Sequence, residues 1–138
     1  MVKSIQVIIL LLLIGCEEPC KSDCSINIYS ELPQDEDGVY QLEFNADLAQ
    51  TYSILDVSTE CGWSQHIQWD SDYMYNIQGS WISIVNPASM TDEDGNAKIV
   101  FAVWEEFINE TVTIYGGYMD DHGHHKVDSV KVYVTDNQ

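Results

Sequence analysis

Apolar and polar residues alternate with a period of two along most of the chain beyond residue 24. Successive side chains of a β-strand point to opposite faces, so this period predicts strands that bury one face. No segment beyond residue 24 shows a helical period. The alternating apolar positions are Ile26 and Ile28; Tyr40, Leu42 and Phe44; Leu55 and Val57; Ile67 and Trp69; Ile82 and Ile84; Val112 and Ile114; and Val130, Val132 and Val134.

Turn residues break this pattern about every ten positions. The tetrapeptide Asp-Glu-Asp-Gly occurs twice, at residues 35–38 and 92–95, and precedes a predicted strand each time. Asp-Gly favours tight turns because glycine accepts a positive φ without steric cost. Residues 98–104 are apolar on both faces and predict a central strand. Seven or eight short antiparallel strands of this kind predict an all-β fold, an immunoglobulin-like β-sandwich with its first strand at an edge.

The first residues have the pattern of a short export signal. Lys3 supplies a positive charge, and residues 5–14 are apolar except for Gln6. This apolar run is too short to span a bilayer, which needs about twenty helical residues. Residues 1–14 therefore predict an exported protein.

The sequence Leu13-Ile14-Gly15-Cys16 at the end of this run resembles a bacterial lipobox. In lipoproteins with that motif, the cysteine becomes the new N-terminus, and acyl chains are attached to its thiol and its amine. Several acyl chains anchor a protein more firmly than one chain, which binds a membrane only marginally. The resemblance implies lipidation at Cys16, and the alternative is an ordinary secretory signal followed by a chance cysteine.

We therefore divide the chain into a lipoprotein signal peptide (1–15), a lipidated N-terminus with an acidic tether (16–24) and a β-sandwich domain (25–138). The acidic residues after Cys16 resemble surface-export signals of Bacteroidetes lipoproteins. The expected location is the bacterial cell envelope, anchored by lipid to the outer membrane and facing either the periplasm or the cell surface.

Three further cysteines, Cys20, Cys24 and Cys61, follow the lipobox. An exported protein meets an oxidising environment, so one disulfide and one spare thiol are predicted. A Cys24–Cys61 bond would tie the first strand to the domain, whereas a Cys20–Cys24 bond would close only a small loop. We favour the first pairing and leave the second open. A zinc site is disfavoured because the spacing lacks the usual cysteine pairs.

Net charge excludes one class of partner. The chain has 23 acidic residues against five lysines, with no arginine, for a net charge of −18. Such a field repels phosphate backbones, so nucleic-acid binding is not expected. The acidity is typical of a solvated surface and is also compatible with a basic protein partner or with cation binding.

Four segments in order, residues 42–63, 80–103, 110–117 and 127–134, resemble a BACON domain, a small immunoglobulin-like module common in secreted proteins of Bacteroidetes. Trp63, the pair Trp81-Ile82, the pair Gly95-Asn96 and the valine-rich end of the last segment occupy the positions of the family pattern. The resemblance covers residues 39–134 and implies an association with carbohydrate. The chain departs from the pattern by lacking the arginine that commonly precedes the penultimate strand.

A histidine-rich segment follows the 110–117 strand. It reads MDDHGHHK, and neutral imidazole and carboxylate groups of this kind suit zinc, nickel or copper. The alternative is a solvated hairpin loop, because the segment contains glycine and lies between two predicted strands. The candidate divalent-metal ligands are His122, His124, His125, Asp120 and Asp121, and no other cofactor is predicted.

Several aromatic residues are predicted to be exposed. Strand parity puts Trp81, Tyr115 and Tyr133 opposite the aliphatic faces of their strands, and Tyr73 and Tyr75 lie in a long segment before residue 80. Exposed rings suit sugars and protein anchors alike, so these five are candidate ligand-binding residues. Packing inside the sandwich is the alternative for Trp81.

No nucleophile elbow, catalytic triad spacing or phosphate loop is present in the sequence, so we do not predict an enzyme. The expected function is that of a lipid-anchored, exported cell-envelope binding module, with carbohydrate as the ligand class that the family resemblance implies. An acidic immunity or inhibitor-type lipoprotein that binds a basic protein is an alternative from another class. A structural spacer domain is a third.

Overall fold

The computed structural model describes residues 24–60, 64–73, 82–120 and 122–137. These residues form nine β-strands and one short 3-10 turn, η1 (Glu105–Phe107). No helix in this part of the chain is long and apolar enough to cross a bilayer. The strands are β1 (Ile26–Tyr29), β2 (Tyr40–Phe44), β3 (Gln50–Thr59), β4 (His66–Ser71), β5 (Ser83–Val85), β6 (Ala88–Met90), β7 (Asn96–Trp104), β8 (Thr111–Met119) and β9 (His125–Asp136).

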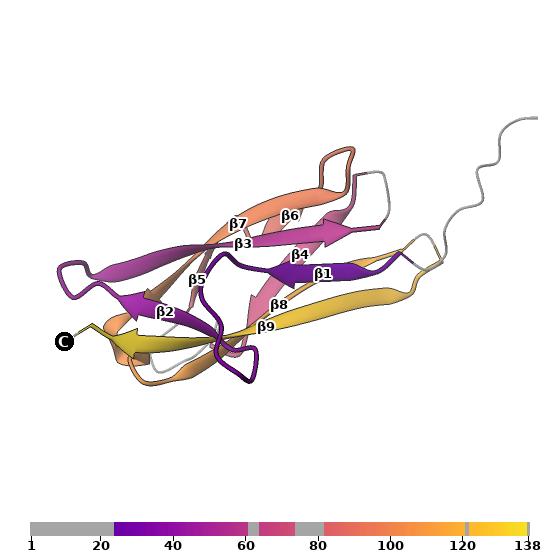
Figure 1. Ribbon diagram of the computed structural model, residues 1–138. Helices are drawn as coiled ribbons and strands as arrows, with labels where there is room; N and C mark the ends of the chain where they lie inside the picture. The colour runs from indigo at the N-terminus through magenta and orange to yellow at the C-terminus, as the bar shows by residue number, and fades with distance from the viewer. Residues whose placement is uncertain (1–23, 61–63, 74–81, 121, 138) are drawn as a thin grey trace, which may run out of the picture.

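The strands form two sheets that pack as layers (Figure 1). The four-stranded sheet has the order β1-β3-β7-β5, and the five-stranded sheet has the order β2-β9-β8-β4-β6. The first order corresponds to strands A, B, E and D of an immunoglobulin domain, and β9-β8-β4 corresponds to G, F and C. The predicted all-β, immunoglobulin-like sandwich is confirmed, and β1 lies at a sheet edge as expected.

Two features of the sheets differ from the sequence-based expectation. The described residues hold nine strands rather than seven or eight, because β5 and β6 are separate three-residue strands. In addition, β2 pairs with β9 in parallel, with Tyr40 opposite Val132, whereas all pairs were expected to be antiparallel. Alternation of side chains reports which face is buried and carries no information on strand direction.

The core lies between the sheets and contains the alternating apolar positions that the sequence pattern marks. Strand β7 lies between β3 and β5, as its apolar character on both faces predicts. Burying one large aliphatic side chain contributes about 1.5–3 kcal/mol, so this set supplies the main stabilisation of the fold. The side chains with no exposed surface include Leu55, Val57, Ile67, Phe101, Val103, Val112, Ile114, Val132 and Val134.

One turn geometry recurs three times in the described part of the chain. In each copy an aspartate Oδ1 accepts the backbone N–H groups of the residues two and four positions later, and a glycine at the third position has a φ between 77° and 84°. A positive φ of this size favours glycine because it has no Cβ. The copies begin at Asp35, Asp92 and Asp120.

Candidate functional site

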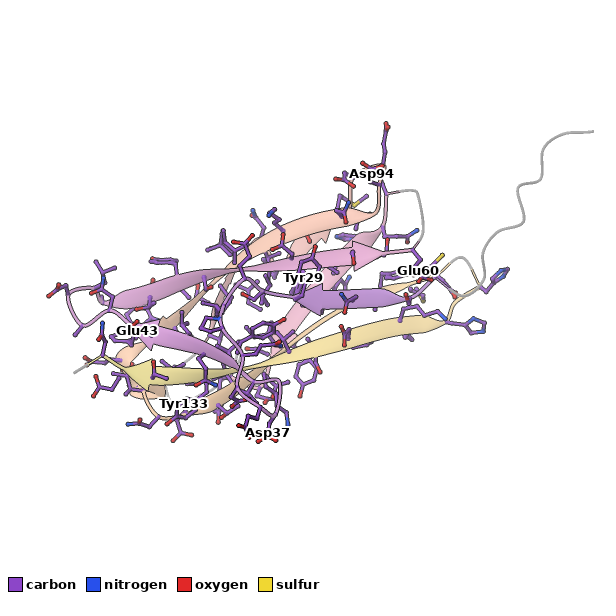
Figure 2. The ribbon with its side chains drawn as sticks, in the orientation of Figure 1. Tyr29, Asp37, Glu43, Glu60, Asp94 and Tyr133 are labelled. Atoms are coloured by element: carbon purple, nitrogen blue, oxygen red, sulfur yellow. The ribbon has the colours of Figure 1, made fainter. Side chains whose placement is uncertain are left out.

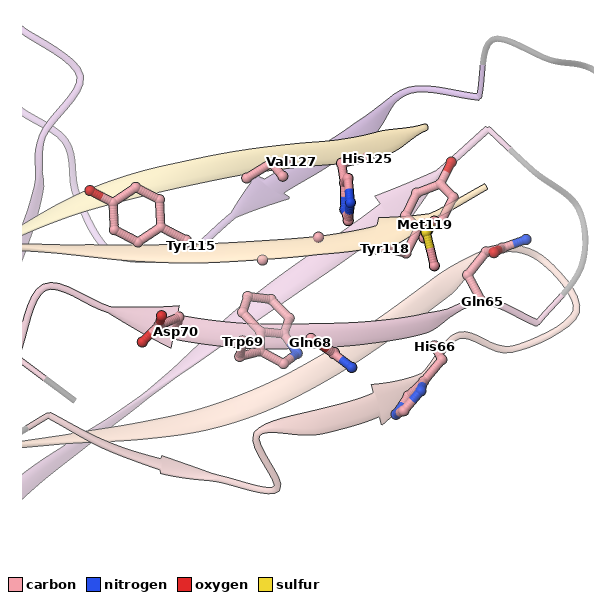
Figure 3. A pocket seen from close by; sticks show the side chains of 12 residues that line it. Gln65, His66, Gln68, Trp69, Asp70, Tyr115, Tyr118, Met119, His125 and Val127 are labelled. Carbon is pink, nitrogen blue, oxygen red and sulfur yellow. The ribbon is translucent and has the colours of Figure 1, made fainter. Parts of the chain in front are cut away.

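A shallow groove of about 640 Å³ crosses the outer face of the five-stranded sheet, over β4, β8 and β9 (Figure 3). Most of the residues that line it lie at alternate positions of these strands, with the parity opposite to the core, and Trp69, Gly116 and Tyr118 of the core parity also border it. The residues with side chains or backbone on this outer face of the groove are His66, Gln68, Asp70, Tyr115, Gly117, Met119, His125 and Val127.

The floor of the groove is formed by Gly117. In the sheet register Gly117 pairs with Gln68 on one side and with Val127 on the other. Because glycine has no side chain, the sheet is hollowed between these two neighbours. A Cβ at Gly117 would lie 2.7 Å from the backbone oxygen of Lys126, so the close approach of β9 also requires glycine. Val127 is 62% exposed and offers an apolar wall to the hollow.

Tyr115 provides an aromatic surface beside this hollow. It is 38% exposed, and its hydroxyl donates a 2.9 Å hydrogen bond to Oδ1 of Asp72. This hydrogen bond to a carboxylate is the main reason why the pKa of Tyr115 lies above its ordinary value. The bond holds the ring at its hydroxyl end, so the orientation of the aromatic ring in the groove is fixed.

Polar side chains surround the apolar floor. Asp70 lies directly opposite Tyr115 in the β4–β8 pair, and Ser129 lies opposite it in the β8–β9 pair. His66 and Gln68 continue the outer face of β4, and both are exposed. The groove therefore combines an aromatic ring, an apolar wall and a set of hydrogen-bonding groups, which is the composition of a small-ligand site.

Two of the predicted aromatic residues lie on this sheet face. Tyr115 lines the groove, and Tyr133 pairs with Thr111 two same-face positions further along, with its hydroxyl 3.3 Å from Oδ1 of Asn109. Tyr73 takes no part in the groove, since it is half-buried and packs edge-on against Phe107 with ring centroids 5.0 Å apart. Tyr75 and Trp81 lie outside the described residues.

The histidine-rich segment is divided by the third aspartate turn. The Asp120 carboxylate accepts the N–H groups of His122 at 3.0 Å and His124 at 2.8 Å, and its Oδ2 lies 3.3 Å from Nδ1 of His124. The backbone hydrogen bond from His124 is the main cause of the lowered pKa of Asp120. Oδ1 of this carboxylate is therefore occupied within the turn, and the neighbour of Oδ2 is the His124 imidazole.

The other predicted metal ligands are separated by the same turn. His122 and His124 have ring centroids 6.3 Å apart, whereas His125 begins β9 and lines the groove. Asp121 lies outside the described residues. Among the residues that the structure does describe, no three His, Cys, Asp or Glu side chains are grouped so that they could hold a metal ion.

Cys24 is buried at the start of the domain and is disulfide-bonded. The hydroxyl of Tyr118 donates a 2.9 Å hydrogen bond to its backbone oxygen, which fixes the chain where it enters the sandwich. The other three cysteines, Cys16, Cys20 and Cys61, lie outside the described residues, and so do the predicted signal peptide and most of the tether.

A second surface lies on the opposite side of the sandwich, on the outer face of the four-stranded sheet. Ile54 pairs with Val100, which pairs in turn with Val85, and Tyr52 lies two positions from Ile54 on the same face of β3. Tyr52, Ile54 and Val85 are each about half exposed. We call these four residues the apolar strip.

Acidic side chains surround both sheets rather than gathering at one place. Figure 2 shows Asp37 and Asp94 in turns, Glu43 on β2 and Glu60 beyond the end of β3. Next to the apolar strip, Asp56 pairs with Lys98 at 2.8 Å. The labelled acidic residues are therefore spread over several strands and turns of the sandwich.

No protein-family model matches the sequence. No curated protein matches it either. Among solved structures, the chain is similar to the CupB2 chaperone of Pseudomonas aeruginosa, with a TM-score of 0.53 and 13% identity over 71% of this chain and 54% of the chaperone. It is also similar to a FixG-related protein of Vibrio parahaemolyticus, with a TM-score of 0.44 and 9% identity over 80% of this chain and 95% of that one.

The comparison with the chaperone bears on the fold alone, which it supports as a β-sandwich module. The chain spans about half the length of that chaperone. The outer-face residues of the groove that the sequence pattern did not predict are His66, Gln68, Asp70, Gly117, Met119 and Val127. Gly117 and Met119 could have been predicted on the same face as Tyr115, because they follow it at alternate positions of one strand. The sequence gives no comparable indication that β4 lies next to β8.

Proposed function

We propose that this protein is a lipid-anchored, exported β-sandwich module of the bacterial cell envelope that binds a glycan in the groove on its five-stranded sheet. The observation that carries the proposal is the exposed Tyr115 ring beside the hollow at Gly117. The BACON-like sequence pattern supports the same ligand class.

The chemistry of the groove suits a sugar ring. The C–H face of a pyranose packs on an aromatic ring, and its hydroxyls need several donors and acceptors at the edge. Gln68 and Asp70 supply such groups on β4. The net charge of −18 disfavours an anionic sugar, so the proposed ligand is a neutral glycan or an amino sugar.

Glycan-array binding tests this proposal, with neutral, amino and anionic glycans on the same array. Tyr115→Ala removes the stacking surface and should abolish binding, whereas Tyr133→Ala removes the same ring type outside the groove and should leave binding intact. A folded protein that binds no glycan would reject the proposal, and so would binding that survives Tyr115→Ala.

The lipid anchor has its own test. Cys16→Ser removes the acylated residue, so the precursor should stay uncleaved and no mature-sized protein should appear in the detergent phase. If the variant still matures and remains membrane-bound, lipidation at Cys16 is wrong. This outcome is independent of glycan binding.

A basic protein partner is the second candidate, and the apolar strip favours it. An apolar surface on a chain with a net charge of −18 suits a partner with an apolar contact surrounded by lysine or arginine. Association that weakens as salt rises, and that Ile54→Ser abolishes while Tyr115→Ala does not, would support this function. A spacer would show neither kind of binding.

A further inference from the structure

We propose that one end of the groove binds a copper(I) ion through the thioether of Met119 and the imidazoles of His66 and His125. This site goes beyond the proposed glycan binding and does not depend on it. It also differs from the metal cluster that the sequence suggests, because only His125 belongs to both.

The sheet register brings the three residues together. Met119 pairs directly with His125 across β8 and β9. On the other side, the β4–β8 ladder ends with Gln68 opposite Gly117, and His66 and Met119 each lie two residues beyond this last pair. His66 also pairs with Met90 of β6. All three line the groove, and Figure 3 shows them at the same end of it, with the His66 ring on the side of β4 toward β6.

The spacing of neighbouring strands allows one ion to contact all three side chains. Opposed residues of adjacent strands have Cβ atoms about 4.5–5.5 Å apart. Metal–nitrogen and metal–sulfur bonds are about 2.0–2.3 Å long. Because Met119 is on the central strand of the three, its sulfur and the His125 imidazole can bind one ion directly, and the exposed His66 side chain completes the site when it turns toward β8.

The three side chains are free to coordinate. Met119 is 61% exposed, and both histidines are also exposed. Within the described residues, neither imidazole takes part in a hydrogen bond or ion pair, in contrast to His124, which lies against Asp120. No internal contact therefore has to be broken before a metal ion binds.

The donor set identifies the metal. A soft thioether selects copper(I), and imidazole is a common copper ligand, whereas zinc prefers cysteine thiolate, histidine and carboxylate. A thioether also cannot be lost to disulfide formation in an oxidising compartment. The negative field of the chain attracts a cation to the groove.

The test uses the mature full-length chain in detergent, with any free thiol blocked by iodoacetamide so that cysteine cannot bind the probe. Silver(I) serves as a redox-inert probe in NMR spectra of methyl-labelled methionine, and copper(I) affinity is measured by competition with a chromophoric chelator. One equivalent of silver should shift the Met119 methyl signal, which Met119→Leu identifies.

The variants separate this site from the histidine-rich turn. Met119→Leu and His125→Gln should each weaken copper(I) binding by at least about tenfold, a typical effect of disrupting a metal site. The matched control, His122→Gln with His124→Gln, removes two exposed histidines outside the groove and should leave the affinity unchanged. Far-UV circular dichroism checks that each variant is folded.

Three results would overturn the proposal: no silver or copper(I) binding, binding that Met119→Leu leaves intact, or binding that the His122/His124 control removes. Tyr115→Ala should not affect copper(I) binding. Failure of the copper site and failure of glycan binding are therefore separate outcomes.

Discussion

The carboxylate of Asp128 on β9 accepts a 2.7 Å hydrogen bond from the backbone N–H of Ile28 on β1. These strands belong to different sheets, so this bond joins the two layers along one side of the sandwich (Figure 1). Because β1 is an edge strand, its outward N–H would otherwise be open to pair with another chain. Asp128 therefore links the two sheets and occupies an N–H group on the edge strand β1.

Loss of this bond should destabilise the fold. We expect Asp128→Ala to lower the free energy of unfolding by about 1–2 kcal/mol, since the bond involves a charged acceptor in a partly buried position. Asp128→Asn keeps an acceptor oxygen and should cost less. Urea unfolding measures both. Glu43→Ala is the control, because it removes an exposed negative charge without a bond, and an equal loss there would contradict the assignment.

The backbone at Gly116 lies against the core, so a methyl group there should be poorly tolerated. A Cβ would lie 2.9 Å from Cδ1 of Ile28 and 2.9 Å from Cζ3 of Trp69. Gly116→Ala should lower stability by about 1–3 kcal/mol, the usual cost of overpacking. Thermal or urea unfolding gives the value.

A double-mutant cycle identifies the cause of that loss. Ile28→Val removes the Cδ1 atom, so it should partly rescue Gly116→Ala. Gly123→Ala is the comparison, because a Cβ there meets no atom within 4 Å and the cost arises from its φ of 79° instead. Ile28→Val should not rescue Gly123→Ala, and strict additivity at Gly116 would show that contact with Ile28 is not the cause.

Asp120 should couple the stability of the fold to acidic pH. Its folded-state pKa is below the ordinary value of 3.8, mainly because of the backbone N–H of His124. A lowered pKa stabilises the fold at pH values above the unfolded pKa, and this contribution is lost as pH falls through the folded pKa. The stability difference between the native chain and Asp120→Asn should therefore shrink as pH falls from about 5 to about 2.

Carboxyl-carbon NMR titration checks the same group directly. It should give Asp120 a pKa below 3.8. His124→Gln removes the imidazole and keeps the backbone N–H, so it should raise that pKa only partway. A return to the full ordinary value in this variant would mean that the imidazole, and not the backbone bond, is the main cause.

The disulfide partner of Cys24 is predicted to be Cys61. Ile26 pairs with Thr59, and Glu60 donates its N–H to the backbone oxygen of Ser25, so the register leads to Cys24 and, in sequence, to the residue after Glu60. Mass spectrometry of non-reduced peptides should find these two cysteines linked. A Cys20–Cys24 link would reject the prediction.

Removal of this disulfide should change the stability of the domain. Cys61→Ser should destabilise the domain by about 2–5 kcal/mol, as is usual for a native disulfide in a small exported domain. Cys20→Ser should have little effect if its thiol is the spare one. Reversal of these two effects would again favour the small-loop pairing.

The alternation of apolar residues was enough to predict the sandwich, its core and the edge position of β1. These properties depend on local chemistry: a period of two buries one face of a strand, and Asp-Gly sequences make tight turns. Parity also predicted that Tyr115 and Tyr133 would face outward, which the structure confirms.

The tertiary structure decided the features that depend on which strands are neighbours. Parallel pairing of β2 with β9 joins segments far apart in the chain, and no local pattern encodes it. The contact of Tyr73 with Phe107 also joins segments far apart in the chain, so no local pattern predicts it. The histidine-rich segment is a case in which a local pattern was present and was not used. Its composition suggested metal ligands, but its aspartate and glycine are spaced as in the turns at residues 35–38 and 92–95, and it forms the same turn.

The sequence by itself therefore determined which face of each strand is buried, because that choice follows from the residues of the strand alone. Only the tertiary structure decided what shares the exposed face, because cross-strand register is set by packing of the whole sandwich. The groove at Gly117 and the row formed by His66, Met119 and His125 arise from that register.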